Sequence, residues 1–157
     1  MASNIGITPA LGVIGQYPGS SKNKVIVWMC RSKSLIKFFT PLFKDAHLTI
    51  IYYTGRDELS PTELKHIYMY GNIFIQQSRP ESLVESIACI IVHYERKFAS
   101  DKECSTYELK INTMNDLSDK NRSEWVLLYC GGVRCIKKDL SKFAKKTGIY
   151  FQTEMFG

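Results

Sequence analysis

The sequence predicts an α/β protein built on a parallel sheet of about five strands, with helices on both faces. Two observations predict this class. Short runs rich in β-branched and aromatic residues recur along the chain, and segments with the helical spacing of apolar residues lie between them. A strand followed by a helix, repeated, joins parallel strands, because each helix carries the chain back along a face of the sheet.

The predicted strands are five segments with the composition of strands buried on both faces. They are residues 24–29, 48–53, 73–76, 125–129 and 149–152. Between the first two, an apolar stripe indicates a helix that Pro41 is expected to bend or shorten. The stripe consists of Leu35, Phe38, Phe39 and Leu42.

Further helices are expected in the middle and at the end of the chain. A short one follows Pro61, and a longer one follows Pro80. The longer helix has an apolar stripe made of Leu83, Ile87, Ile90, Ile91, Tyr94 and Phe98. The last helix is expected over residues 133–146 and ends at Gly148, because glycine readily takes the left-handed conformation of a helix end. Residues 99–123 are polar and predict an inserted loop, with at most a weak strand at 107–111.

The beginning of the chain departs from this rhythm. A helix is expected over residues 10–14, with Thr8 as its N-cap and Pro9 at its first position. In a Rossmann-like sheet, a glycine turn of this kind follows a strand. Since only five residues precede Gly6, we expect the usual first strand to be missing from this chain.

Size and composition predict one soluble domain over residues 1–157. Hydrophobic residues make up 45% of the 157 residues and charged residues 23%, which are values of a folded protein. No apolar run approaches the roughly 18 residues of a membrane span, and the first residues lack the pattern of a secretion signal. The five cysteines show neither a CxxC pair nor a regular spacing, and the three histidines are dispersed, so no disulfide scaffold or metal site is expected. A reducing compartment is therefore favoured.

Small, polar and basic residues follow the predicted strands, where parallel sheets bind their ligands. They are Cys30 with Arg31, Thr54 with Gly55, Ser78 with Arg79 and Pro80, and Cys130 with Gly131 and Gly132. The net charge of +6 permits attraction to phosphate on a nucleic acid, a lipid or a nucleotide. Each feature alone also fits a solvated strand end or a tight turn, but together they indicate one ligand-binding crevice.

Six short motifs follow one another along the chain: SNIGITP, IVWMCR with SLIKFF, IYYTG, SRP, LYCGG and FQTEMF. Their order and spacing resemble the pyridine-nucleotide-binding domain of ferredoxin-NADP reductase-like flavoenzymes, in particular the ferric reductase and NADPH oxidase branch. The resemblance covers nearly the whole chain apart from residues 99–123.

The resemblance implies a role for each motif. The turn that starts at Gly6 would cradle the nucleotide pyrophosphate, and Arg31 would meet the 2′-phosphate of NADPH. Cys130 would lie beside the nicotinamide, at the mouth of its pocket and more exposed than Cys89. Phe156 would cover the flavin until the nicotinamide displaces it, so Cys130 and Phe156 are the implied catalytic residues. The implied cofactor-binding residues are Gly6, Ile7, Thr8, Pro9, Cys30, Arg31, Thr54, Gly55, Arg79, Pro80, Cys130, Gly131, Glu154 and Phe156.

The sequence also departs from the family. Ser3 and Asn4 stand where two glycines are usual, Ser78 replaces a glycine, and Gly132 replaces a proline. No segment matches the flavin-binding barrel or the haem-carrying transmembrane helices of such enzymes. The chain therefore resembles the C-terminal half of a reductase.

The resemblance implies an NADPH-dependent oxidoreductase that passes electrons through FAD and haem to ferric iron or oxygen. Its partners would be the FAD-binding domain and the transmembrane haem domain of the same polypeptide, and it would act at the cytosolic face of a membrane, without nucleic acid. The isolated chain would be inactive, because the flavin is bound mainly by the missing barrel.

An alternative function rests on the basic segment 134–146, which carries six lysine or arginine residues and one aspartate. In that interpretation the chain is a non-catalytic basic α/β module that binds a protein or nucleic acid. A solvated helix face explains the same charges.

Overall fold

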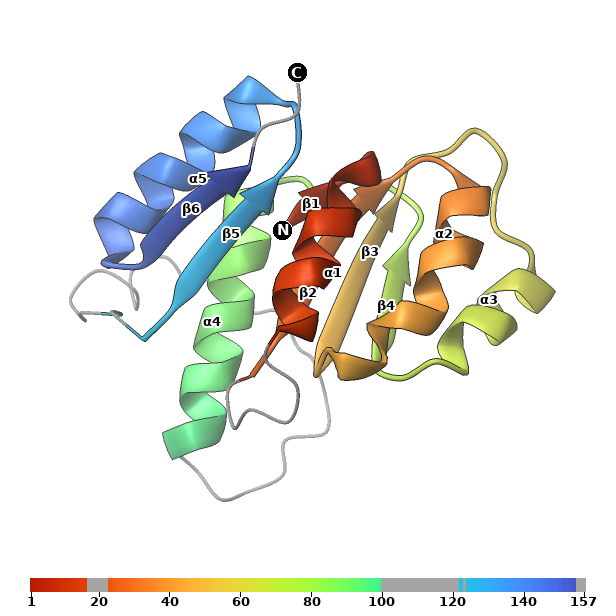
Figure 1. Ribbon diagram of the computed structural model, residues 1–157, viewed down its shortest axis with the longest axis horizontal. Helices are drawn as coiled ribbons and strands as arrows, with labels where there is room; N and C mark the ends of the chain where they lie inside the picture. The colour runs from red at the N-terminus through yellow and green to blue at the C-terminus, as the bar shows by residue number, and fades with distance from the viewer. Residues whose placement is uncertain (17–22, 100–121, 123, 155–157) are drawn as a thin grey trace. The chain divides into compact units, whose positions relative to one another are not determined.

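The computed structural model describes residues 1–16, 23–99, 122 and 124–154. Within them, six parallel strands form one sheet in the order β4-β3-β2-β1-β5-β6 (Figure 1). The strands are β1 (Ala2–Ser3), β2 (Val25–Cys30), β3 (Leu48–Tyr53), β4 (Ile73–Gln76), β5 (Val126–Cys130) and β6 (Tyr150–Glu154). The helices are α1 (Ile7–Gly15), α2 (Lys33–Phe39), α3 (Pro61–Tyr68), α4 (Leu83–Ala99) and α5 (Arg134–Thr147), with the 3₁₀ turns η1 (Asn4–Gly6) and η2 (Thr40–Asp45). The predicted class, a Rossmann-like α/β fold, is confirmed.

The chain divides into two compact units. The first comprises Met1–Arg79, Leu128–Val133 and Gln152–Gly157, and the second comprises Pro80–Leu127 and Arg134–Phe151. Strands β5 and β6 each contribute residues to both units.

The first strand is present, contrary to the sequence-based expectation. Ala2 pairs with Trp28 of β2 and with Cys130 of β5, and Ser3 pairs with Met29. The Met1 carbonyl oxygen also accepts a hydrogen bond of 3.0 Å from the Cys130 N–H. The few residues before the Gly6 turn are therefore enough to occupy the centre of the sheet, and it has six strands rather than about five. A strand of two residues is too short to show a periodicity.

The other strands lie within two residues of their predicted bounds at each end. β3 and β4 match the prediction at both ends. All six residues of β3 are buried, which agrees with the expectation of a strand covered on both faces. β2 and β3 pair in parallel along their whole length, from Val25 with Leu48 to Cys30 with Tyr53.

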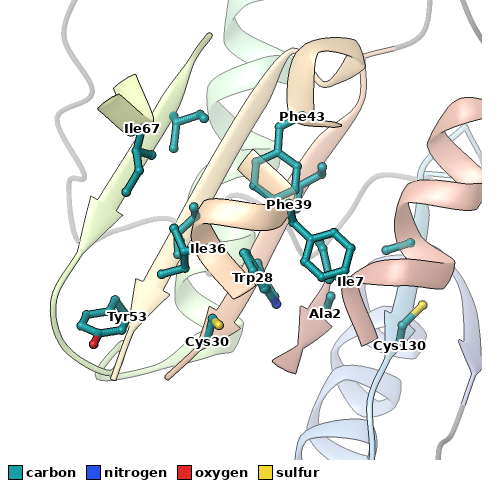
Figure 2. Packing of buried hydrophobic residues seen from close by; sticks show 14 of the residues in the cluster. Ala2, Ile7, Trp28, Cys30, Ile36, Phe39, Phe43, Tyr53, Ile67 and Cys130 are labelled. Atoms are coloured by element: carbon teal, nitrogen blue, oxygen red, sulfur yellow. The ribbon is translucent and has the colours of Figure 1, made fainter. Parts of the chain in front are cut away.

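Trp28 is at the centre of the core of the first unit (Figure 2). Its ring makes edge contacts with Phe39 and Phe43, at centroid distances of 6.0 and 5.8 Å. Aromatic pairs in this geometry stabilise a core beyond the apolar area that they bury. Ile7 of α1 and Ile36 of α2 complete this part of the cluster.

The buried face of α2 differs by one residue from the predicted stripe. Ile36, Phe39 and Phe43 are buried, whereas Phe38 is 69% exposed and Leu42 49% exposed. The buried face has the same helical spacing but includes Thr40, whose hydroxyl donates to the Ile36 carbonyl and so loses no hydrogen bond on burial. Because threonine is polar, the hydrophobic pattern of the sequence did not indicate that this face is the buried one. As predicted, the α-helix ends before Pro41 and continues as a 3₁₀ turn.

The second unit contains the two later helices, which contact each other. The predicted stripe of α4 is confirmed at Ile87, Ile90, Ile91 and Tyr94, all of which are buried. α5 ends before Gly148, which has a φ of 71° and forms the expected left-handed helix end.

Arg122 shows that the predicted insertion reaches the core of the second unit. Residues 100–121 and 123, including the weak strand expected at 107–111, lie outside the described residues. Arg122 itself is only 3% exposed, and its Nε is 2.7 Å from Glu95 Oε1 of α4. Its Nη1 donates to the carbonyl oxygen of Thr147, at the end of α5, over 3.5 Å. One buried guanidinium therefore links the two helices of this unit.

Candidate functional site

The strand order reverses between β1 and β5, and this reversal locates the candidate site. From β1 the chain continues to β2, β3 and β4 on one side, and then to β5 and β6 on the other side. Ligands of open α/β sheets bind outside the carboxyl ends of the strands at such a point. The turn after β1 and the turn after β5 lie there, because their strands are neighbours in the sheet.

These two turns touch each other through their backbones. A Cβ atom added to Gly6 would lie 2.2 Å from the carbonyl oxygen of Cys130. A Cβ atom added to Gly131 would lie 2.3 Å from Ser3 Oγ and 2.7 Å from the hydroxyl oxygen of Tyr129. Real Cβ atoms do not come this close to other atoms. The atoms near Gly6 belong to the backbone of Cys130 and cannot rotate away, so Gly6 requires glycine, whereas those near Gly131 belong to two side chains. The predicted site residues Gly6, Cys130 and Gly131 are thus brought together.

Asn4 and Trp28 shape the first turn, and the sequence analysis missed their role. Asn4 has a φ of 46°, a left-handed conformation that asparagine tolerates better than most other residues with a side chain. Its carbonyl oxygen accepts a hydrogen bond of 2.8 Å from Trp28 Nε1. Asparagine therefore suits the left-handed backbone conformation at this position. The available signal was an asparagine two residues before the glycine of the turn.

The start of α1 lies earlier than predicted. The helix begins at Ile7 with Gly6 in the N-cap position, and no side chain caps it. The expected N-cap Thr8 and the expected first residue Pro9 are its second and third residues. The reason is the 3₁₀ turn η1, which leads directly into the helix, with the Ile7 N–H bonded to the carbonyls of Asn4 and Ile5.

Arg31 is the exposed cation at the end of β2. The preceding Cys30 is buried, and burial raises the pKa of its thiol. The following Ser32 accepts a hydrogen bond from the Leu35 N–H and so caps α2. Lys33 is engaged elsewhere, because its Nζ donates to the Glu58 carbonyl over 2.6 Å and lies 3.1 Å from Glu63 Oε2. Arg31 is therefore held at the surface between two anchored neighbours.

Contacts within the fold account for the threonine and the glycine at the predicted site residues Thr54 and Gly55. The Thr54 N–H donates to the Cys30 carbonyl over 2.9 Å, which continues the pairing of β3 with β2. A Cβ atom on Gly55 would lie 2.0 Å from the hydroxyl oxygen of Tyr53, which itself donates to the Asp57 carbonyl. Arg56 follows as a second exposed cation at this edge of the sheet. Arg56 was not among the predicted site residues, although it directly follows Thr54 and Gly55 in the sequence.

Cys130 is less accessible than predicted. It is 0% exposed, whereas Cys89 has intermediate exposure, so the expected order of the two is wrong. Cys130 is buried because it ends β5 in the middle of the sheet, against the Gly6 turn. Burial raises the pKa of its thiol. The next N–H, of Gly131, donates to the Glu154 carbonyl over 3.1 Å. Glu154 thus joins the site through its backbone.

The remaining predicted residues are less informative. Arg79 is exposed and ends the first unit, and Pro80 begins the second. Phe156 lies outside the described residues.

The α-amino group of Met1 lies inside the sheet, beside the candidate site. It donates a hydrogen bond of 2.5 Å to the Leu128 carbonyl. Burial lowers its pKa from the ordinary value of 8.0 to about 6, and the nearby Cys130 thiol opposes this shift only in part. The folded protein therefore binds fewer protons at this group than the unfolded chain does between pH 6 and 8.

We expect the free energy of unfolding of the chain with a free α-amino group to rise between pH 6 and 8. The rise from this group is roughly 2–3 kcal/mol, because each unit of pKa shift corresponds to about 1.4 kcal/mol. The measurement is urea unfolding at pH 6, 7 and 8 on this chain and on an Nα-acetylated control, which has no amine to protonate. If the free energy of unfolding rises equally with pH in both proteins, the lowered pKa of the α-amino group is contradicted. The histidines do not affect this comparison, because both proteins contain them.

Comparison of the chain with protein-family models, with curated proteins and with solved structures finds no match. The fold defines its class as a Rossmann-like α/β protein, and the candidate site lies at the point of strand reversal. Among the described residues, no helix has both the length and the apolar character needed to cross a membrane. In the same part of the chain, no three histidine, cysteine, aspartate or glutamate side chains are grouped closely enough to hold a metal ion.

Proposed function

We propose that this chain is the NADPH-binding part of a flavin-dependent oxidoreductase of the ferredoxin-NADP reductase-like superfamily. One observation carries the proposal: the glycine turn after β1 lies against the backbone of the glycine turn after β5, at the reversal of strand order. This is the place where open α/β sheets bind dinucleotides. The order of the sequence motifs along the chain supports the same conclusion.

The charge of the strand ends favours NADPH over NADH. Arg31 and Arg56 are exposed after two paired strands, β2 and β3. A free ribose hydroxyl is usually recognised by a carboxylate at the end of the second strand, whereas a 2′-phosphate is matched by a guanidinium. The residue after β2 is an arginine, so a phosphate fits this position better than a hydroxyl.

The chain's own residues would bind and orient the nucleotide rather than take part in covalent chemistry. NADPH, when bound, supplies a hydride from nicotinamide C4 to flavin N5. The turn at Gly131 would align the nicotinamide, with Cys130 anchoring that turn from below because its thiol is buried. Phe156 would cover the flavin. In the full-length enzyme, FAD and haem domains would carry the electrons on to ferric iron or oxygen at the cytosolic face of a membrane.

Replacing Arg31 with alanine tests the assignment of the 2′-phosphate. We expect NADPH affinity to fall about 10- to 100-fold, because losing a charge-assisted hydrogen bond costs roughly 1.5–3 kcal/mol. NADH affinity should stay nearly unchanged. Calorimetry with both nucleotides measures the difference, and Lys65→Ala on α3 is a control with the same loss of charge at an exposed residue. If the affinities for both nucleotides fall equally, or if neither affinity changes, the proposed role of Arg31 is contradicted.

A further inference from the structure

In the second unit, α5 carries a dense group of cations, which we call the basic face of α5. Its residues are Arg134, Lys137, Lys138, Lys142, Lys145 and Lys146. Four of them, Arg134, Lys138, Lys142 and Lys146, recur every four residues and so follow one line along the helix. At 1.5 Å per residue, the line is about 18 Å long. The opposite side of α5, with Leu140, Phe143 and Ala144, is buried.

The fold does not need these charges in this arrangement. Like charges four residues apart repel each other and slightly destabilise a helix. The helix dipole favours only the cations of the last turn, Lys145 and Lys146, and disfavours Arg134 in the first turn. Within the described part of the chain, no ion pair involves any of the six. Helix stability therefore does not account for this arrangement of the cations.

Two large apolar side chains are exposed next to the end of this row. Val126 at the start of β5 is 60% exposed, and Tyr150 at the start of β6 is 62% exposed. They line an open cleft of about 510 Å³ together with Lys145 of the basic face. Cations and a tyrosine on one surface are the combination found where proteins rest on lipid headgroups.

We propose that the basic face of α5, with Val126 and Tyr150, docks on a membrane surface that contains anionic phospholipids. Five of the six cations are lysines, which are hydrated point charges suited to diffuse attraction by many headgroups. A nucleic-acid site that reads sequence would favour arginine, asparagine and glutamine, which form directed hydrogen bonds with base edges. Because the apolar side of α5 is buried in the unit, the contact is electrostatic, with the two exposed side chains at the level of the headgroups.

The test is co-sedimentation of the chain with vesicles of 30% phosphatidylserine and 70% phosphatidylcholine. We expect binding that disappears with pure phosphatidylcholine and at 0.5 M salt, because salt screens exposed charges. In the Lys138→Gln/Lys142→Gln variant the affinity should fall about 25-fold, since each cation contributes about 1 kcal/mol, or about fivefold, near an anionic surface. The same variant should melt at an equal or higher temperature, because repulsion within the row is relieved.

The matched control is Lys44→Gln/Lys65→Gln, two exposed lysines of the first unit, with the same change of charge and an expected loss of less than twofold. Equal loss in both variants, binding to neutral vesicles, or a lower melting temperature of the α5 variant would overturn the proposal. Tighter binding of a single-stranded oligonucleotide per phosphate than of vesicles per anionic lipid would assign the face to nucleic acid instead. NADPH binding is measured separately, so a failure here leaves the proposed function standing.

Discussion

Replacing Gly6 with alanine is expected to destabilise the protein by about 3 kcal/mol, the upper end of the usual range for overpacking. The backbone of Gly6 has a φ of −58°, which alanine adopts without strain, so the effect is steric. The added Cβ would lie 2.2 Å from the carbonyl oxygen and 2.8 Å from the carbonyl carbon of Cys130. These are backbone atoms of a central strand and cannot rotate away. Relief requires the start of α1 to move off β5, which would also open the candidate site.

Gly12→Ala, in the same helix, is the matched control. A Cβ atom at Gly12 meets no other atom within 4 Å. Alanine should therefore stabilise α1 by about 0.5–1 kcal/mol, since glycine is the poorer helix former. Urea unfolding of the two variants and the wild-type protein gives both values. If Gly6→Ala is no less stable than the wild-type protein, the turns after β1 and β5 are not in contact as described.

Replacing Arg122 with alanine is expected to lower the free energy of unfolding of the second unit by about 3 kcal/mol, the lower end of the range for a buried ion pair, because the Glu95 side chain keeps 24% of its exposure. Its buried guanidinium makes two contacts with the carboxylate of Glu95 and one with the carbonyl of Thr147. Removing one partner of a buried ion pair leaves the other charge without compensation. Arg122→Lys should recover only part of the loss, because an ammonium cannot bind a carboxylate in the bidentate way of a guanidinium.

Arg134→Ala provides the comparison for Arg122, because it removes the same charge from an exposed position of the same unit. A change within about 0.5 kcal/mol is expected there. The readout is the denaturant midpoint of each variant. A loss at Arg122 no larger than that at Arg134 would mean that Arg122 does not link α4 to α5.

Most of the fold was predictable because its signals are local. The strand at residues 48–53 consists of β-branched, aromatic and other large side chains, and a run of this kind is typical of a strand buried on both faces. The last helix was recognisable at its end from Gly148, since few other residues take its positive φ. The ends of such strands and helices can be predicted because they depend on the composition and the backbone preferences of only a few neighbouring residues.

The sequence-based predictions of the first strand and of the buried face of α2 were wrong, and the burial of Arg122 was not predicted, because tertiary contacts determine the structure at these places. Ala2 and Ser3 form a strand only because β2 and β5 pair with them from either side. Thr40 is buried because its hydroxyl returns a hydrogen bond to its own helix, and no hydrophobicity pattern shows this. Arg122 lies in a polar segment typical of a loop, yet it is buried because Glu95 of α4 pairs with its charge and the Thr147 carbonyl of α5 accepts a hydrogen bond.

The candidate site was predictable as a set of residues but not in its geometry. Gly6 and Gly131 were chosen for their motifs, and the contact between their turns is visible only in the structure. The burial of Cys130 and the hydrogen bond from Trp28 to Asn4 likewise depend on neighbours far apart in the sequence.

We propose, above all, that the turns at the carboxyl ends of β1 and β5 bind NADPH. Calorimetric titration of the chain with NADPH and with NADH, in parallel and at one salt concentration, tests it most directly. We predict saturable binding of one NADPH per chain, about 10- to 100-fold tighter than that of NADH, because only NADPH carries the phosphate that Arg31 would pair with. Absence of NADPH binding, or equal affinity for the two nucleotides, would contradict the account.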